Sequence, residues 1–457
     1  MPLMRPLLRW LSRAELLWLA LLAPLLFFPG DGRGLAIVAL PLLWLLRKAA
    51  KGYLLPRTPV NAPLLLLLLM LGVAFTVSFD QDFSFPYLTR ALLGIAIFFA
   101  LVDVTEADRA LFLSLMALVV TTSAFLVMGL INTQWAAKIP QLEPVVAQIP
   151  TVSLPFPGAA DAFNPNIIAG MALYVGPLLL ASLWPRHSPV LTLLDRRWRA
   201  LPYVALLPVA LLAVGLLILT QSRGGYLGFA VGLAALLLMR DRRWFGAALL
   251  AAIVAGAVLY GTNRTVLLAY FNEADMRAVS TGIDSLQGRM EIWSRAIYAM
   301  EDFPFTGVGL GLFRQVVPLL YPLFTISPDH DIGHAHNQFL AAAVDVGIPG
   351  LIAYLALWLS MAAMLWRSWH SALPTPYRRI ALGLAASLAA HFTWSVTDAL
   401  VIGARGQLPF WMLLASVVAL HRTAVTHDAE AMRRGGPPGP NEGAAVPDLN
   451  VLVNRES

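Results

Sequence analysis

Three of the eight histidines lie within seven residues of one another, at His330, His334 and His336. Histidine serves as a metal ligand, as a packed or helix-capping side chain, or as a general base that works near neutral pH. The spacing lacks the HExxH pattern of a zinc-binding helix, and no nearby residues complete a familiar ligand set. We therefore favour a histidine of this segment as a general base, or as the group that holds a substrate hydroxyl, over a metal ligand.

Arg223 and Arg289 are candidates to bind an anion because both are expected on the outer side of the membrane, where positive charge is scarce. Arg223 precedes Gly224 and Gly225 at the start of an apolar run, where a phosphate could approach the backbone of a helix N-terminus. The competing interpretation is an interfacial arginine that extends toward water. Arg289 lies in the segment Gly-Arg-Met-Glu-Ile-Trp, and its competing interpretation is an ion pair with Glu291 or Asp284.

The composition indicates the environment in which these residues act. The chain has 457 residues, of which 58% are hydrophobic and only 13% are charged, whereas soluble proteins hold about 25% charged residues. This excludes a soluble enzyme, a disordered scaffold and a fibrous repeat. Unbroken apolar runs such as Leu64–Leu71 do not suit the alternating strands of a membrane barrel. We predict an all-α polytopic membrane protein, and the absence of cysteine excludes disulfides and thiolate ligands.

Apolar runs of sufficient length predict about 12 transmembrane helices. The runs are Glu15–Phe28, Leu35–Leu46, Pro63–Val77, Ala91–Val102, Ala110–Ile131, Ile167–Trp184, Pro202–Thr220, Tyr226–Met239, Phe245–Tyr260, Gly350–Trp366, Ile380–Ala399 and Pro409–Leu420. With both termini in the cytoplasm, most Lys and Arg residues fall on the inner side, as the positive-inside rule requires. The histidines, Arg223 and Arg289 then lie outside, and the net charge of +6 reflects topology rather than nucleic-acid binding.

The same runs divide the chain into four parts. Residues 1–261 hold the first nine spans and a proline-rich outer segment near 132–164, and residues 262–346 form a large outer loop with the histidines. Residues 347–422 hold the last three spans, and residues 423–457 are predicted to be a disordered cytoplasmic tail. The large loop is rich in aromatic residues, so we expect it to fold as helices that lie against the membrane surface.

Several segments resemble one family. His336-Asn337, nine residues and then Gly347-Ile348-Pro349-Gly350 resemble the His-Asn-x9-Gly-x-x-Gly signature of bacterial O-antigen ligases. The wider ligase and polymerase superfamily is similar at Ser222–Gly225, Gly288–Trp293, Pro304–Gly311 and Phe163–Gly170.

The resemblance implies a GT-C-like membrane glycosyltransferase of the bacterial inner membrane with its active site facing the periplasm. It would transfer a polysaccharide from undecaprenyl pyrophosphate to a sugar hydroxyl of lipid A-core, with inversion and without a metal or nucleotide. His336 would accept the hydroxyl proton, and Arg223 and Arg289 would bind the pyrophosphate. Asn337 and Asn166 are further candidates for substrate binding, although a helix cap is as good an interpretation of Asn166. Besides these two substrates, the expected partners are membrane lipids.

Other activities remain open at this stage. An O-antigen polymerase, or a protein O-oligosaccharyltransferase, would use the same lipid-linked donor. A transporter is the alternative of another class, but transporters carry ionisable residues near the middle of their spans. The spans here are almost free of charge, and Asp398, near the outer end of a late run, is the main exception.

Overall fold

The computed structural model describes residues 4–28, 30, 32–135, 137–152, 163–183, 201–240, 286–327 and 330–434, together with 243, 246, 250 and 254. Within these residues the protein is almost wholly α-helical. Extended pairing in this part of the chain is confined to one bridge between Thr133 and Phe163. The prediction of an all-α fold is confirmed.

The helices follow the predicted apolar runs. They are α1 (Met4–Arg13), α2 (Glu15–Phe27), α3 (Arg33–Lys51), α4 (Asn61–Val77), α5 (Gln81–Val102), α6 (Ala107–Ile131), α7 (Glu143–Val146), α8 (Pro165–Leu183), α10 (Leu201–Thr220), α11 (Arg223–Arg240), α13 (Leu286–Asp302), α14 (Phe313–Leu320), α15 (Gln338–His370), α16 (Thr375–Ser395) and α17 (Leu408–Arg433), with short 3-10 helices η1 (Pro140–Leu142) and η3 (Arg405–Gln407). Every predicted run coincides with a helix except the ninth, Phe245–Tyr260, which lies largely outside the described residues.

Helix length and surface composition indicate a membrane protein. Within the described residues, five helices are long and apolar enough to cross a membrane: α5, α6, α8, α15 and the continuous η3–α17. Shorter apolar helices lie beside them in α2, α4, α10 and α11. Large apolar side chains are exposed on the outer helices, among them Leu21, Leu35, Phe112 and Leu211, a surface that suits lipid rather than water. The chain is a polytopic membrane protein, and the total of about 12 spans stays a prediction.

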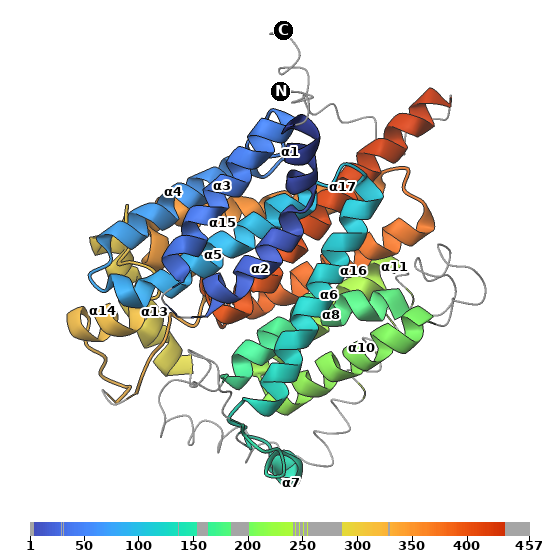
Figure 1. Ribbon diagram of the computed structural model, residues 1–457. Helices are drawn as coiled ribbons and strands as arrows, with labels where there is room; N and C mark the ends of the chain where they lie inside the picture. The colour runs from blue at the N-terminus through green and yellow to red at the C-terminus, as the bar shows by residue number, and fades with distance from the viewer. Residues whose placement is uncertain are drawn as a thin grey trace.

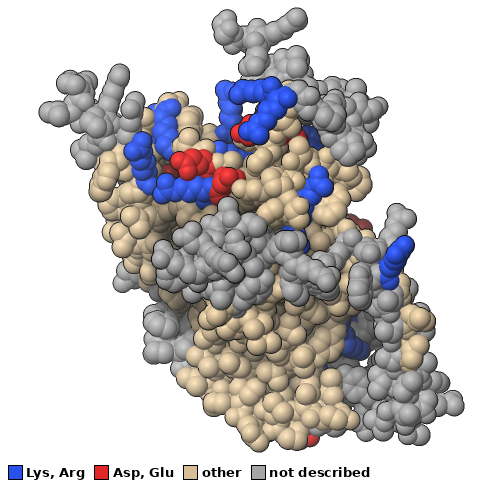
Figure 2. Space-filling view, turned by 90° about the vertical axis from the view of Figure 1, so that its right-hand side faces the viewer, with Lys and Arg blue, Asp and Glu red and all other residues tan. Residues whose placement is uncertain are grey.

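The two ends of the bundle differ in charge. Figure 1 places α1 and the C-terminal end of α17 at the top and α7 at the bottom, with α13 and α14 at the lower left. Figure 2 shows most of the visible Lys and Arg side chains of that face toward the top, above a largely uncharged surface. At this end of the bundle, Arg47 is fully buried and pairs with Glu15 and with Asp103, the latter at 3.2 Å. Asp103 also pairs with Lys51 at 2.6 Å. These ion pairs tie the ends of α2, α3 and α5 together.

Helix α17 corrects the predicted start of the tail. The tail was expected from residue 423, but the helix continues to Arg433. Two contacts hold this extension: the Thr423 hydroxyl donates to Asp108 at 3.2 Å, and the Ala372 N–H donates to Asp428 at 2.6 Å. The rest of the predicted tail, from residue 435, lies outside the described residues.

Helix α15 crosses the predicted boundary between the large loop and the tenth span. It runs from the histidine motif into the span as one element with a kink at Gly347, where φ is +71°. A Cβ added there would lie 2.5 Å from the carbonyl oxygen of Phe305, so the position requires glycine on both counts. The Val308 N–H donates to the Val344 carbonyl at 2.8 Å. The Gly-rich segment after α13 is thereby docked on the kink.

Helix α16 ends earlier than the apolar run predicts. The run extends to Ala399, whereas the helix stops at Ser395. The Trp394 carbonyl then accepts from the N–H groups of Thr397 and Asp398, at 2.9 and 3.0 Å, and closes a turn. Asp398 therefore lies in a loop beyond the helix. Under this turn α8 and α16 pack closely, because Gly170 leaves room for the Trp394 ring.

The large outer loop folds as predicted where it is described. Helices α13 and α14 occupy it, and α13 packs against α15. Residues 262–285 of the loop lie outside the described ranges, and the position of α13 and α14 against a membrane surface stays a prediction.

Candidate functional site

The histidine motif forms the entry to α15. Asn337 is the N-cap residue, and its Oδ1 accepts from the N–H groups of Phe339 and Leu340 at 3.0 and 3.1 Å, the usual role of asparagine at a helix start. The preceding residue, His336, has a positive φ of 45°, which is uncommon for a residue other than glycine. Its N–H donates to Nδ1 of His334 at 3.1 Å. The side chain of His334 therefore helps to hold the backbone turn at His336.

Side-chain amides join this entry to the loop that follows α16. The Asn337 Nδ2 donates to the Val396 carbonyl at 3.0 Å. Gln338 makes two hydrogen bonds with the backbone of Leu400. Its Nε2 donates to the carbonyl at 2.8 Å, and its Oε1 accepts from the N–H at 2.6 Å. Gln338 is buried, so water does not compete with these bonds. The two loops are fixed to each other on both sides of Asp398.

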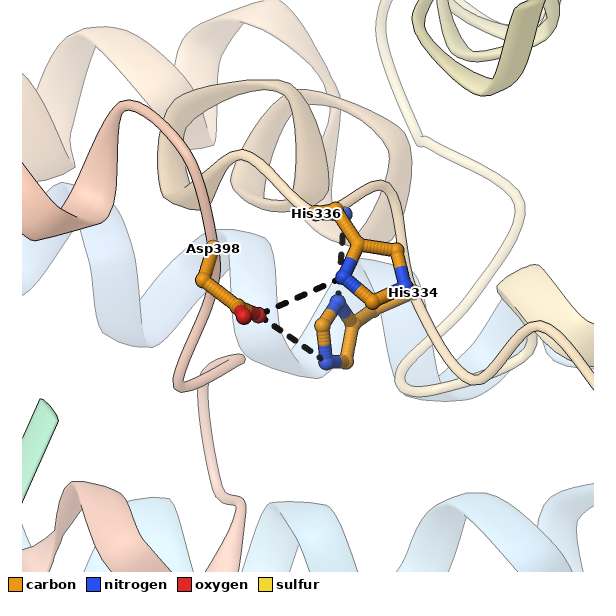
Figure 3. A group of neighbouring side chains, drawn as sticks. All are labelled: His334, His336 and Asp398. Carbon is orange, nitrogen blue, oxygen red and sulfur yellow. Dashed lines mark hydrogen bonds and ion pairs between the residues drawn. The ribbon is translucent and has the colours of Figure 1, made fainter. Parts of the chain in front are cut away.

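Asp398, His334 and His336 meet in the space between these loops (Figure 3). Oδ1 of Asp398 lies 3.4 Å from Nδ1 of His336 and 3.8 Å from Nε2 of His334. The two imidazole rings are 4.5 Å apart between centroids. Asp398 is 3% exposed and His336 is 8% exposed. The second ring nitrogen of His336, Nε2, points away from the carboxylate (Figure 3).

Burial and neighbouring charges determine how this cluster is protonated. Burial, followed by the nearby His336, lowers the pKa of His334 to about 3, so this imidazole is neutral at neutral pH and its Nδ1 can accept a hydrogen bond. Burial alone would raise the pKa of Asp398, but His336, His334 and Arg289 outweigh it and hold that pKa below its usual range. The cluster thus holds an ionised carboxylate beside an imidazole.

Arg289 reaches the same cluster from α13. Its charge is close enough to act on both His334 and Asp398. One turn further along α13, the Trp293 indole N–H donates to the His336 carbonyl at 3.4 Å. The Nε of Arg289 is buried and has no hydrogen-bond partner within the described part of the chain. A buried guanidinium N–H in that state can still bind an anion.

Of the two carboxylates considered for Arg289, Glu291 pairs with another arginine, and Asp284 lies outside the described residues. The Glu291 carboxylate lies 3.5 Å from Arg295 and accepts from the N–H groups of Phe324 and Thr325 at 2.6 and 3.0 Å. Glu291 therefore anchors the 321–325 loop to α13.

Arg223 begins α11 at the edge of the same loop. A Cβ added at the next residue, Gly224, would collide with the Thr397 hydroxyl, so the N-terminus of α11 lies against the turn that holds Asp398. Arg223 itself is exposed. Two residues earlier, Gln221 has a positive φ of 50°, and its Oε1 accepts from the N–H groups of Lys138 and Ile139 at 2.6 and 2.5 Å. The proline-rich segment is thereby bound to the α10–α11 junction.

The two asparagines of the sequence prediction have structural contacts. Both ends of the Asn337 amide are engaged, as the cap of α15 and as the bond to Val396. Asn166 is buried near the start of α8, and its N–H donates to Oδ1 of Asn164 at 2.8 Å, so Asn164 provides the cap. Substrate contacts by Asn337 or Asn166 stay predictions.

Two residues of the cluster were not assigned to the site from the sequence. Asp398 was noted only as an unusual charge at the end of a span, and His334 only as one of three close histidines. A buried carboxylate in an almost uncharged stretch was the available signal for Asp398. Nothing in the spacing indicates that it meets a residue 62 positions earlier.

The arrangement suits proton transfer. A carboxylate on one imidazole nitrogen orients the ring and stabilises its charged form, which leaves the other nitrogen to accept a proton. His334, His336 and Asp398 also offer three ligand atoms within 4.8 Å of one another, a separation that could admit a metal ion. However, Nδ1 of His334 accepts the His336 N–H, so its proton is on Nε2, the nitrogen that faces Asp398 and would have to bind the ion. The hydrogen bonding favours the acid–base role.

Comparison with known proteins shows similarity to one family over part of the chain. Residues 208–355 match the model of the O-antigen ligase family. The matched stretch begins in α10 and ends in α15, and it includes Arg223, Arg289 and His336 but stops before Asp398. A search of curated proteins found no match to the chain. Through the segment 208–355, the chain resembles the O-antigen ligase family.

Proposed function

We propose that the protein is an O-antigen ligase that joins a lipid-linked polysaccharide to lipid A-core. The donor is an undecaprenyl pyrophosphate-linked glycan, the acceptor is a sugar hydroxyl, and the site faces the periplasm from the inner membrane. The observation that carries the proposal is the Asp398–His336 pair, with 3.4 Å between Oδ1 and Nδ1, beside Arg289 and the start of α11. This combines a base with cationic groups, as a hydroxyl attack on a pyrophosphate-activated sugar requires.

His336 acts as the general base in this proposal. Its Nε2 accepts the proton of the acceptor hydroxyl while the hydroxyl oxygen forms a bond to the anomeric carbon. The bond from that carbon to the pyrophosphate oxygen breaks, and undecaprenyl pyrophosphate leaves with the electron pair. Asp398 stabilises the resulting imidazolium. A single displacement of this kind inverts the anomeric configuration and needs neither a nucleotide nor a metal ion.

Arg289 and Arg223 support departure of the pyrophosphate. The leaving group gains negative charge in the transition state, and guanidinium groups bind phosphate oxygens in a bidentate manner. Arg289 brings a buried Nε without a partner in the described part of the chain. Arg223 stands at a helix N-terminus, where the backbone adds partial positive charge.

Genetic complementation tests this function. We expect that deletion of the gene in its host removes long chains from lipid A-core, while finished polymer accumulates on the lipid carrier. The wild-type gene restores ligation, and a His336→Ala gene does not. If single repeat units accumulate instead, the protein is a polymerase. If lipopolysaccharide is unchanged and a protein loses its glycan, it is an oligosaccharyltransferase.

A further inference from the structure

Three arginines that the proposed transfer does not use come together beside the candidate site. Arg33 is the first residue of α3, Arg90 lies on α5 and Arg405 begins η3. The charges of Arg33 and Arg405 both act on Arg90. We propose that this three-arginine cluster binds the phosphate group of a lipid headgroup.

The cluster adjoins the loop that carries Asp398. Gly403, in that loop, has a positive φ of 79° and lies directly against the backbone of Tyr87, less than one turn before Arg90. Arg405 follows two residues later. A lipid held by the cluster would therefore sit next to the catalytic loop while contacting other side chains.

Two of the guanidinium groups are fixed on the same helix end. The Nε of Arg33 donates to the Phe28 carbonyl at 2.8 Å, and the Nε of Arg90 donates to the Phe27 carbonyl at 2.9 Å. The Arg90 guanidinium also lies 5.5 Å from the centroid of the Phe27 ring. These consecutive carbonyls end α2, where the helix dipole favours a cation. These contacts explain where the two arginines lie. Each guanidinium uses only its Nε–H for these carbonyls.

The remaining donors point to an anion. Arg33 is 5% exposed, and its Nη2 has no hydrogen-bond partner among the described residues. In the same part of the chain, no carboxylate forms an ion pair with Arg33 or Arg90. The charge of a buried guanidinium such as that of Arg33 is unfavourable unless an anion joins it. The planar, forked guanidinium matches the oxygens of phosphate.

The surroundings favour a lipid over free phosphate. Helices α2 and α3, which lie beside the cluster, expose apolar side chains at Leu21, Leu25, Leu35 and Val38. A hydrocarbon chain lies favourably on such a surface, and a phosphate attached to it would reach the arginines. Inorganic phosphate would contact the arginines but would leave this apolar surface uncovered.

The proposal is tested by binding of a fluorescent short-chain phosphatidic acid to the purified full-length protein in neutral detergent. The titration is done in a His336→Ala background, so that its outcome does not depend on transfer activity. Arg33→Gln and Arg90→Gln each remove a charge-assisted phosphate contact and are expected to weaken binding about tenfold. Arg109→Gln, an exposed arginine of α6, is the matched control and should bind as the parent does.

Several outcomes would overturn the proposal. These are unchanged affinity in Arg33→Gln, equal binding of a phosphatidylcholine probe, and displacement of the probe by inorganic phosphate as effectively as by unlabelled phosphatidic acid. Arg405→Gln supplies an independent variant if Arg33→Gln does not fold, and it too must weaken binding. Asp31 lies outside the described residues, and Asp31→Asn should leave binding intact. Binding that appears only in that variant would show that the arginines are neutralised internally.

Discussion

In the proposed transfer, Asp398 is the residue on which the chemistry most depends after His336. It lies 3.4 Å from His336, it is buried, and its carboxylate is held in the ionised form. An oriented carboxylate fixes the imidazole ring and supplies a counter-charge when the imidazole accepts a proton. Without it, the imidazole would be free to rotate and would have no counter-charge when protonated.

Asp398→Asn is therefore expected to reduce ligation about 10²- to 10⁴-fold while the protein still folds. The substitution keeps the size of the side chain and removes its charge. Transfer of labelled polysaccharide to lipid A-core measures the effect. Asp331→Asn is the control, because Asp331 is exposed and pairs with Arg314, and it should stay within a few-fold of wild type. Near-normal transfer by Asp398→Asn would remove the carboxylate from the mechanism.

His334 is expected to act as a positioning residue through its Nδ1. That nitrogen accepts the N–H of His336, whose backbone has a positive φ. His334→Asn places an amide oxygen at a similar distance from the backbone, so we expect it to retain much of the activity. His334→Gln moves the acceptor outward and His334→Ala removes it, and both should lower the rate about tenfold or more. Equal losses in all three variants would argue against this role.

At the scale of elements, the site depends on two loops from different helices. The entry to α15 supplies the histidines, the loop after α16 supplies Asp398, and Gln338 joins them through two bonds to Leu400. The start of α11 and the face of α13 then bring Arg223 and Arg289 to the same region. The geometry of the site therefore depends on the hydrogen bonds that hold these two loops together.

Gln338→Ala should loosen the Asp398 loop and lower the transfer rate about tenfold or more, because two buried hydrogen bonds are lost. The variant is also expected to lower the thermal midpoint of the purified protein. Gln315→Ala is a matched control that loses one half-buried bond to Asp80, at 3.2 Å, away from the cluster. If both variants keep the wild-type rate, the Gln338–Leu400 bonds do not position Asp398.

Sequence patterns predicted the helices better than their ends or their contacts. Apolar runs indicate spans because lipid requires them, and the order of the motifs placed Arg223, Arg289 and His336 in one region. The pattern extended α16 to Ala399, where the chain instead turns, since apolar character alone does not encode a buried loop. The pattern also ended α17 too early, because the hydrogen bond between Thr423 and Asp108 is a tertiary contact that a local sequence pattern does not show.

For the whole molecule, the separation of charge predicts orientation. Arg47, Lys51 and their acidic partners gather at one end of the bundle, and the histidine cluster lies beyond the opposite ends of the same spans. The positive-inside rule then predicts that the histidine cluster lies on the outer side of the membrane.

Cysteine labelling tests this orientation directly, because the chain contains no cysteine. Phe305, in the loop after α13, is 75% exposed, and Phe305→Cys should react with a membrane-impermeant maleimide in intact cells. Arg434→Cys, just beyond α17, should react only after the membrane is opened. The reverse pattern, or labelling of both residues in intact cells, would contradict the proposed topology.

The most direct test of the account is transfer by the purified protein in proteoliposomes. These would hold a lipid-linked polysaccharide and lipid A-core, without nucleotide or added metal. We predict that polysaccharide appears on lipid A-core with inverted anomeric configuration, and that His336→Ala forms no product. Elongated glycan that stays on the lipid carrier, or normal transfer by His336→Ala, would contradict the account.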